Sequence, residues 1–400
     1  MKLIFFPYIF TFFILFTSCE VGKKDKTVEN KITVNDSADI EKNDADEKAL
    51  RLNNMVRLIS GKDTILNFRS DLTKKDSFLL FCKNTNKKFE KMEKLRLFKF
   101  NEWSSNILKK QSLPDSNFCF YPFAGGDFIH AHYLYPNASE YLLFALEPVG
   151  SIPDFYTMEE DEILRYLNNM DTVLRNIYVN SYFITKNMFQ DIKRKEKVDG
   201  VLPLILWGIG RSGYDVTGAE FFGIDSLGNK TTIEKTKNGY AKSEGVTILI
   251  KKDGKEKRVT YISADMSDEK LLKSNAAIKY LENAIPTRKT TCFIKSASYL
   301  LHYNFFSAIR NLILKKSDII VQDDTGVPYK LLNEKEWEVQ LYGEYKPPLK
   351  DFSKKVFQND LDSAYRDEKK YFGAIPFSIG YHWNNGFQSQ MFIFRKSLKK

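Results

Sequence analysis

Two glycines and two carboxylates stand where a nucleotide-type ligand could bind. Gly125 and Gly126 follow a short apolar run and lead into Asp127, and Glu147 ends the next apolar run. In α/β folds a glycine turn lets a ligand approach the backbone, and a carboxylate after the second strand can accept hydroxyl groups. The alternative is a tight turn in which Asp127 caps a helix and Glu147 binds backbone. The pattern predicts ligand contact or structural capping here, and catalysis by Asp127 and Glu147 is one hypothesis.

A second acidic pair, Asp323 and Asp324, follows the apolar run 319–321 and precedes Thr325-Gly326. Carboxylates at the carboxyl end of a buried strand lie where α/β proteins bind ligands. A like-charge pair can also split its pKa values and serve as acid and base. Neighbouring strand residues point to opposite faces, however, and Asp and Gly are ordinary turn residues. The sequence therefore leaves a catalytic site and a turn as alternatives for this block.

His130 and His132 form the only pair of closely spaced histidines. On a strand they would share one face and could bind a metal, whereas on a helix their rings diverge by roughly 200°. We expect a helix over 128–135, which disfavours a metal site. The turn at Gly125-Gly126 has no G-x-G-x-x-G, and the chain has no P-loop, nucleophile elbow or zinc-protease motif, so we expect no cofactor.

The elements that would position these residues predict an α/β (or α+β) fold with a mixed sheet. Residues 118–147 have the pattern strand, glycine turn, short helix, strand, which favours a parallel βαβ unit. Residues 245–266 alternate around Asp253-Gly254, a strong β-hairpin signal. Flanking helices are expected over 50–59, 158–197, 268–284 and 299–315, and further strands over 77–83, 319–321 and 392–394.

The start of the chain has the pattern of an export signal. Residues 1–18 combine a basic start, an apolar run too short for an ordinary membrane span, and small residues before Cys19. The block Leu15-Phe16-Thr17-Ser18-Cys19 resembles the lipobox of bacterial lipoproteins. That resemblance implies removal of residues 1–18, lipid (palmitate) attachment at Cys19 and a cell-envelope location, with the outer membrane favoured over the inner. A plain signal peptide or an uncleaved anchor is the alternative.

Charge divides the remaining chain into a tether and a body. Residues 20–48 hold six lysines and nine acidic residues and no aromatic residue, so we expect 19–48 to be a disordered tether behind the lipidated cysteine. Residues 49–400 hold 54 basic and 42 acidic residues and should form one α/β body, with a subdivision near 197–200 left open. A basic exported body favours anionic envelope partners, or else is an ordinary solvated surface. No nucleic-acid recognition motif is present, so nucleic acid is not expected as a partner.

Three cysteines remain besides Cys19, namely Cys82, Cys119 and Cys292. Their number and wide spacing fit neither a disulfide framework nor a zinc motif. One disulfide with one spare thiol, or three buried free thiols, are both consistent with the sequence.

Three blocks carry a family resemblance: 121–127 (YPFAGGD), 146–150 (LEPVG) and 321–328 (VQDDTGVP). They resemble an uncharacterised family of exported, bacteroidete-type bacterial lipoproteins. The resemblance supplies no catalytic roles, but it implies that the two acidic blocks belong to one domain. The sequence thus predicts a membrane-anchored lipoprotein that binds an envelope component or a partner protein. The alternative is an α/β hydrolase or transferase acting on cell-surface material with Asp127, Glu147, Asp323 and Asp324 in one cleft.

Overall fold

The computed structural model describes residues 35–110, 118–182, 198–233, 235–236, 239–240, 244–287, 289–349, 352, 356–381 and 390–397. The chain divides into two compact units, Met1–Ala45 and Asp46–Lys400, and a subdivision near 197–200 stays a prediction. Cys19 and the signal at 1–18 lie outside the described residues. Among the residues that are described, no helix has the length and apolar character needed to cross a membrane.

Helix α1 (Asn35–Ile59) corrects the predicted extent of the tether. The expectation of disorder is wrong for residues 35–48, which are helical, while residues 20–34 lie outside the described part of the chain. Val56, Leu58 and Ile59 anchor the end of the helix in the core.

The larger unit is built on a ten-stranded mixed sheet with the order β11-β12-β10-β9-β1-β2-β8-β7-β3-β4. Its central strands are parallel and, in β1, β9 and β10, buried along their whole length. Antiparallel strands extend the sheet on both sides. The parallel strands are β1 (Phe118–Pro122), β2 (Glu140–Ala145), β8 (Lys255–Ser263), β9 (Thr290–Ile294) and β10 (Ile319–Gln322). The antiparallel additions are β3 (Asp215–Ile224), β4 (Lys230–Thr232), β7 (Gly245–Lys252), β11 (Trp337–Gly343) and β12 (Gln390–Lys396), while β5 (Lys235–Thr236) and β6 (Gly239–Tyr240) form a separate pair.

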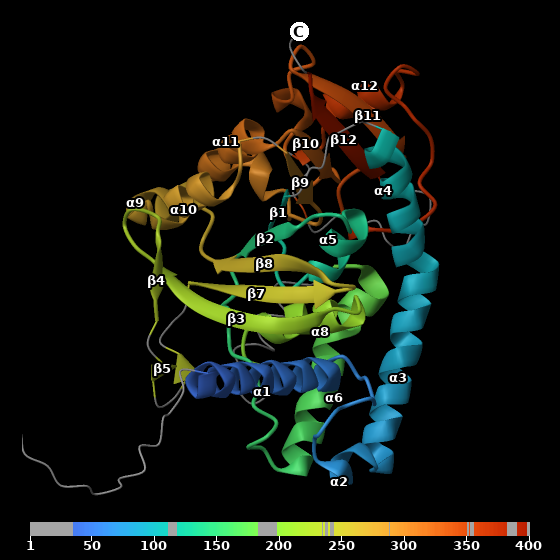
Figure 1. Ribbon diagram of the computed structural model, residues 1–400. Helices are drawn as coiled ribbons and strands as arrows, with labels where there is room; N and C mark the ends of the chain where they lie inside the picture. The colour runs from blue at the N-terminus through green and yellow to red at the C-terminus, as the bar shows by residue number, and fades with distance from the viewer. Residues whose placement is uncertain are drawn as a thin grey trace, which may run out of the picture. The chain divides into compact units, whose positions relative to one another are not determined.

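Helices cover both faces of this sheet (Figure 1). Those before β3 are α2 (Ser70–Thr73), α3 (Asp76–Met92), the π-helix η1 (Glu93–Leu97), α4 (Phe98–Lys110), α5 (Phe128–Leu134), α6 (Glu160–Asn180) and α8 (Leu202–Arg211). Those after β8 are α9 (Asp268–Ser274), α10 (Ala276–Ala284), η2 (Leu300–His302), η3 (Asn304–Phe306), α11 (Ser307–Lys316), η4 (Tyr329–Leu331) and α12 (Asn359–Tyr365). In Figure 1, α9, α10 and α11 lie together on the left and α3, α4 and α6 on the right.

The predicted mixed α/β fold is confirmed. The βαβ unit is β1-α5-β2 with β1 and β2 parallel, and the hairpin is β7-β8 with Asp253 and Gly254 at its turn, both at positive φ. The strands expected over 319–321 and 392–394 are present as β10 and β12.

Several predicted elements differ from the structure. The strand expected over 77–83 is part of α3, whose buried residues recur at helical spacing through Phe78, Phe81 and Phe89, a period that extends beyond the short run itself. The helix over 268–284 is broken at Asn275, which adopts a left-handed conformation (φ 53°). The helix expected over 158–197 is helical to Asn180; residues 183–197 lie outside the described residues.

The helix expected from 299 to 315 begins only at Ser307. Tyr299 has a φ of 56°, which no right-handed helix can include, and two short 3-10 turns precede the true helix start. Tyr299 belongs instead to a loop at the carboxyl end of β9.

The order of the parallel strands creates a switch point between β1 and β9. From β1 the chain passes through α5 to β2 on one side, and from β9 it passes through α11 to β10 on the other. Since such crossovers are right-handed, α5 and α11 lie on opposite faces of the sheet. Open α/β sheets bind ligands outside the carboxyl ends of their strands at such a point.

Candidate functional site

Strained backbone marks the carboxyl ends of β1 and β9. After β9, Ser296 (φ 53°), Ser298 (φ 52°) and Tyr299 (φ 56°) all adopt left-handed conformations. After β1, Phe123 does the same (φ 61°). Each such non-glycine residue costs on the order of 1 kcal/mol and persists only where its surroundings hold it, often at a ligand site. We call residues 295–299 the β9 loop.

A cavity of about 130 Å³, which we call the edge pocket, opens beside this loop. It is lined by residues at or just after the carboxyl ends of four parallel strands, β1, β2, β8 and β9. Its polar lining residues are Glu147, Asp265, Ser296 and Ser298, and its apolar lining residues are Phe123, Ala145, Leu146, Met266, Ala297, Leu300 and Phe306. The pocket thus lies at the carboxyl edge of the sheet, beside the switch point.

Glu147 and Ser296 are the buried polar groups of the edge pocket. Glu147 is 4% exposed, and this burial raises the pKa of its carboxyl, although hydrogen bonds from the backbone of Glu147 and Leu146 oppose the rise. The Ser296 hydroxyl is buried and has no hydrogen-bond partner among the described residues. Asp265 is exposed at the rim and accepts a hydrogen bond from the Ser267 amide at 2.9 Å. The pocket therefore offers hydrogen-bond acceptors beside an apolar wall.

The predicted acidic block at 323–325 holds the β9 loop in place. Asp323 Oδ2 accepts a hydrogen bond from the Ser296 amide at 2.9 Å, and Thr325 Oγ1 accepts one from the Ala297 amide at 2.8 Å. Asp323 Oδ1 in turn accepts from the amide and hydroxyl of Thr325. Asp323 is buried, which raises the pKa of its carboxyl. Its carboxylate positions backbone and does not line the edge pocket.

Asp324 supports the same loop from a second direction. Its Oδ2 accepts a hydrogen bond from the Tyr299 hydroxyl at 2.5 Å. Its backbone oxygen lies 3.2 Å from His302 Nε2 and accepts from Gln358 Nε2 at 3.2 Å. Burial lowers the pKa of His302 to about 4, so this histidine is neutral at pH 7.

Lys295, the first residue of the β9 loop, joins β9 to the predicted Asp127 turn. Its Nζ lies 2.8 Å from Asp127 Oδ2, and the two side chains are 1% and 3% exposed. Lys295 also donates to the backbone oxygen of Ser181, just beyond the end of α6. Tyr121 donates to Asp127 Oδ2 at 3.0 Å and His130 Nδ1 lies 2.8 Å from Asp127 Oδ1. Four side chains therefore form one buried network at the switch point.

Burial and pairing set the charges in this network. Burial opposes ionisation of Asp127, but His130, Lys295 and their hydrogen bonds outweigh it and lower the pKa of Asp127 to about 2. Burial lowers the pKa of His130 to about 4 despite the neighbouring carboxylate. At pH 7, Asp127 is thus a carboxylate paired with Lys295, and a neutral His130 donates through Nδ1.

The acidic blocks predicted from the sequence converge, but not in an open cleft. Asp127 and Asp323 belong to contacts of the consecutive residues Lys295 and Ser296, inside the core. Glu147 is the only one of the four predicted carboxylates in the lining of the edge pocket. The alternative in which Asp127 caps a helix is confirmed, because it accepts from the His130 amide at the start of α5. Catalytic roles for these carboxylates stay predictions.

The two predicted ligand-binding glycines have structural reasons to be glycine. Gly125 has a φ of 53° in the turn after β1. A Cβ added to Gly126 would lie 2.6 Å from the Cβ of Leu204 on α8, so this position must be glycine for the turn and helix to pack. Ligand contact at either glycine stays a prediction.

The histidines do not form a metal site in the described part of the chain. His130 and His132 lie on α5, as expected, and no group of three or more potential ligands is found among the described residues. His132 packs against the rings of Phe128, Tyr141 and Tyr214, and burial lowers its pKa to about 3.

Cys82, Cys119 and Cys292 are free and buried, which answers the alternative left open by the sequence. Burial raises the pKa of Cys82 and Cys119 to about 12 and also raises that of Cys292. These thiols have a packing role.

The residues that sequence reasoning missed are Lys295, Ser296, Ser298 and Asp265. A signal existed for the first three, since a lysine directly after the apolar run 292–294 is followed by the small residues Ser-Ala-Ser. Such a sequence at the end of a buried strand suits a close-packed loop with a buried ion pair. Asp265 carries no comparable signal.

No protein-family model, curated protein or solved structure matches this chain. The resemblance to exported bacterial lipoproteins therefore stays a prediction, and the proposals below depend on geometry and chemistry alone.

Proposed function

We propose that this chain is a lipid-anchored cell-envelope protein, attached to the membrane through Cys19, whose α/β body binds a ligand in the edge pocket. The observation that carries the binding function is the coincidence, in the lining of one cavity beside the switch point, of the buried carboxyl of Glu147 and strained backbone at Phe123, Ser296 and Ser298. The anchor is supported by the lipobox-like block that ends at Cys19.

The lining of the edge pocket specifies the chemistry of its ligand. The carboxyl groups of Glu147 and Asp265 offer oxygen acceptors, while Leu146, Met266 and Phe306 provide an apolar wall. A volume of about 130 Å³ holds roughly six non-hydrogen atoms, the size of benzene. The ligand is therefore a small molecule, or the end group of a larger one, that presents hydroxyl or amine donors beside an apolar part.

Binding is favoured over catalysis by the state of the other carboxylates. Asp127 and Asp323 are committed to Lys295 and to backbone amides, and Asp324 accepts from Tyr299. An acid–base pair needs two groups that reach a substrate. The hydrolase or transferase alternative, which places all four carboxylates in one cleft, draws less support from this arrangement.

A panel of sugars and small amines tests the proposed pocket by thermal shift and then by calorimetry. Compounds that bind the wild type should lose at least about tenfold in affinity in Glu147→Gln, because a hydrogen bond to a charged group is lost or weakened. Glu140→Gln is the matched control: it lies at the opposite end of β2, paired with Arg258 and away from the pocket. Equal affinity of Glu147→Gln and the wild type for every bound compound would contradict the proposal.

The anchor is tested separately. Cys19→Ala should release the protein from membranes or leave its precursor uncleaved, without changing the stability of the body. Membrane fractionation checks this, and full retention of a processed Cys19→Ala protein would contradict lipid attachment at Cys19.

A further inference from the structure

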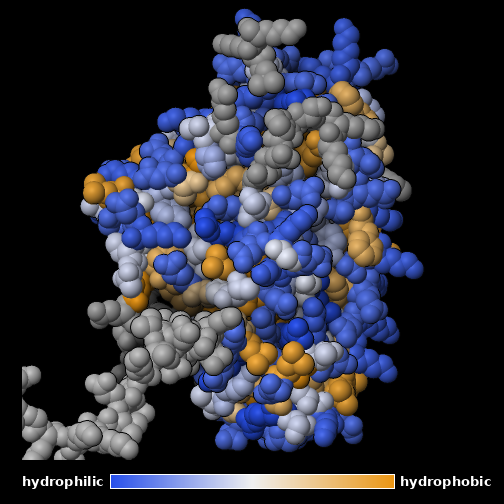
Figure 2. Space-filling model, in the orientation of Figure 1, coloured by the Kyte–Doolittle hydropathy of each residue, from blue (hydrophilic) through white to orange (hydrophobic). Residues whose placement is uncertain are grey.

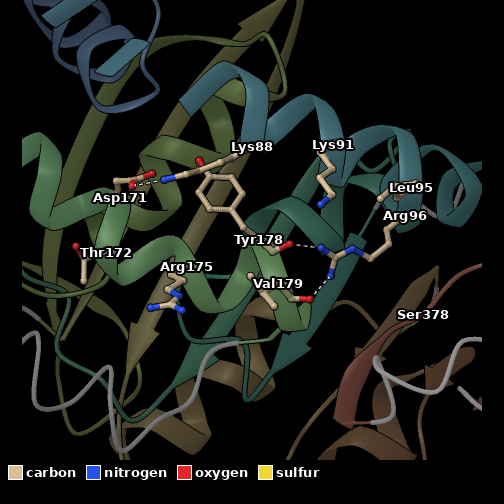
Figure 3. A pocket seen from close by; sticks show the side chains of 10 residues that line it. All are labelled: Lys88, Lys91, Leu95, Arg96, Asp171, Thr172, Arg175, Tyr178, Val179 and Ser378. Carbon is tan, nitrogen blue, oxygen red and sulfur yellow. Dashed lines mark hydrogen bonds and ion pairs between the residues drawn. The ribbon is translucent and has the colours of Figure 1, made fainter. Parts of the chain in front are cut away.

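A second and larger cavity lies between α3, η1 and α6, away from the edge pocket. Its volume is about 670 Å³, within the range of ligand sites. We call it the basic groove. It is lined by Lys88, Lys91, Leu95, Arg96, Asp171, Thr172, Arg175, Tyr178, Val179 and Ser378 (Figure 3).

The described lining of the basic groove holds four cations and one carboxylate. Lys88 pairs with Asp171 across the groove at 2.5 Å. Lys91 reaches from α3 and Arg175 from α6, both exposed (Figure 3). Because the cations outnumber the carboxylate, the groove attracts an anion.

Arg96 makes the floor of the groove rigid. Its guanidinium donates to the backbone oxygens of Tyr178 and Val179, the latter at 2.9 Å, and to the Ser181 hydroxyl. These are contacts with the end of α6, where carbonyls lack partners and a cation is favoured. Burial lowers the pKa of Arg96 to about 10, which still leaves it charged at pH 7. Lys91 and Arg175 are thus presented from two helices that Arg96 fastens together.

Exposed apolar side chains lie beside the cations of the basic groove. Leu95 is 49% exposed and Val179 is 46% exposed, and both line the groove. Phe98, one turn after Leu95, is 55% exposed. Figure 2 shows hydrophobic side chains in small separated groups on a largely hydrophilic face, including the right-hand side where α3 and α4 run. Apolar side chains beside several cations suit an amphipathic anion, whose phosphate would contact the cations of the groove and whose apolar chain would contact Leu95 and Val179.

We propose that the basic groove binds the phosphate headgroup and adjoining chain of an anionic phospholipid. This site is independent of the edge pocket, since the two share no lining residue. Its occupant would be held by the body itself, apart from any lipid attached at Cys19.

Calorimetry on the full chain carrying Cys19→Ala, which cannot be acylated at that position, tests this proposal with three probes. They are dihexanoylphosphatidylglycerol below its micelle concentration, dihexanoylphosphatidylcholine, and glycerol 3-phosphate. The phosphatidylglycerol should bind at least about tenfold more tightly than either of the others, because only it combines net negative charge with apolar chains. Equal affinity for the phosphatidylcholine, equal affinity for glycerol 3-phosphate, or no binding of phosphatidylglycerol would each overturn it.

Two matched double variants locate the site. Lys91→Glu with Arg175→Glu should lower phosphatidylglycerol affinity at least about tenfold, since both charge-assisted contacts become repulsive. Lys83→Glu with Arg165→Glu changes the net charge equally on the same two helices, at exposed positions outside the groove lining, and should leave affinity unchanged. Similar losses in both variants would show attraction to overall charge and overturn the groove. Circular dichroism checks that all four substitutions leave the fold intact.

Discussion

The edge pocket and the basic groove differ in how their charged side chains are held. Beside the edge pocket, Lys295 and Asp127 are 1% and 3% exposed and form part of a closed network. In the basic groove, Lys88 and Asp171 are 46% and 25% exposed, and Lys91 and Arg175 face solvent. Both regions contain lysine–aspartate pairs of similar length, yet water reaches only one of them.

We infer from this difference that buried charged side chains hold the backbone of a site in place, whereas exposed charged side chains can contact a ligand. A buried pair is costly to break because the remaining ion cannot be hydrated, whereas an exposed pair exchanges readily with solvent and ligands. Lys295 and Asp323 therefore fix the backbone beside a pocket, and Lys91 and Arg175 are available to an anion. The predictions below test this separation.

The largest expected effect is on the stability of the Lys295→Met variant. It removes the charge while keeping much of the side chain's length, and it leaves Asp127 buried without its cation, so we expect a loss of about 3–5 kcal/mol in the free energy of unfolding. The matched variant Lys88→Met breaks the exposed pair with Asp171 and should cost at most about 1 kcal/mol. Urea unfolding of both variants measures the contrast; equal losses would remove the distinction between the two regions.

The next largest effect should come from acidification, which acts through three histidines that lie outside the basic groove. The folded-state pKa values of His130, His132 and His302 are lowered to about 4, 3 and 4, below the ordinary 6.5. The unfolded chain therefore binds more protons, and the stability contributed by these groups is present above pH 6.5 and falls as the pH drops towards 4.

His132→Phe isolates one of these contributions. It keeps a ring among Phe128, Tyr141 and Tyr214 but removes the titration. Between pH 7 and 4 the wild type should lose on the order of 3 kcal/mol more than this variant in urea unfolding. Parallel pH profiles would contradict the assignment. None of the described residues that line the basic groove is a histidine, so phosphatidylglycerol binding should not follow this pH profile.

Ser296→Gly should have a smaller effect, and in the opposite direction. Glycine adopts a φ of 53° without strain, so the free energy of unfolding should stay level or rise by up to about 1 kcal/mol. Urea unfolding measures this change, and a clear destabilisation would show that the serine side chain stabilises the loop.

The smallest expected effect is the reactivity of the three body thiols. Cys82, Cys119 and Cys292 are buried and their pKa values are raised, so a thiol reagent should not label them in the native protein. All three should react after unfolding in denaturant without reductant. Rapid native labelling, or fewer than three reactive body thiols after unfolding, would contradict the buried free state.

Sequence patterns predicted the parts of this molecule that are governed by local periodicity. The β1-α5-β2 unit and the β7-β8 hairpin follow from apolar runs punctuated by Gly125-Gly126 and Asp253-Gly254. The helix assigned over 299–315 failed at its start, because the left-handed conformation of Tyr299 depends on Asp324, which is 25 residues away. A contact between residues so far apart in the sequence cannot be inferred from the local composition around Tyr299.

The location of the candidate site could be predicted from the sequence, but the contacts and roles of its carboxylates could not. The acidic blocks were placed correctly after the carboxyl ends of parallel strands of one sheet, β1 and β2 for the first block and β10 for the second. The pairing of Asp127 with Lys295 could not be foreseen, because β9 inserts between β1 and β10 only through tertiary pairing. Asp127 supports the β9 loop through Lys295, whereas Asp323 and Asp324 support it through hydrogen bonds from the Ser296 amide and the Tyr299 hydroxyl.

Amide hydrogen exchange at Ser296 and Ala297 tests most directly whether the buried acidic block holds the β9 loop. Their amides donate to Asp323 Oδ2 and Thr325 Oγ1. They should exchange only at the rate set by global unfolding in the wild type, and much faster in Asp323→Asn, while the amides of α6 beside the basic groove remain unchanged by that substitution. Fast exchange at both amides in the wild type, or unchanged protection in Asp323→Asn, would contradict the account.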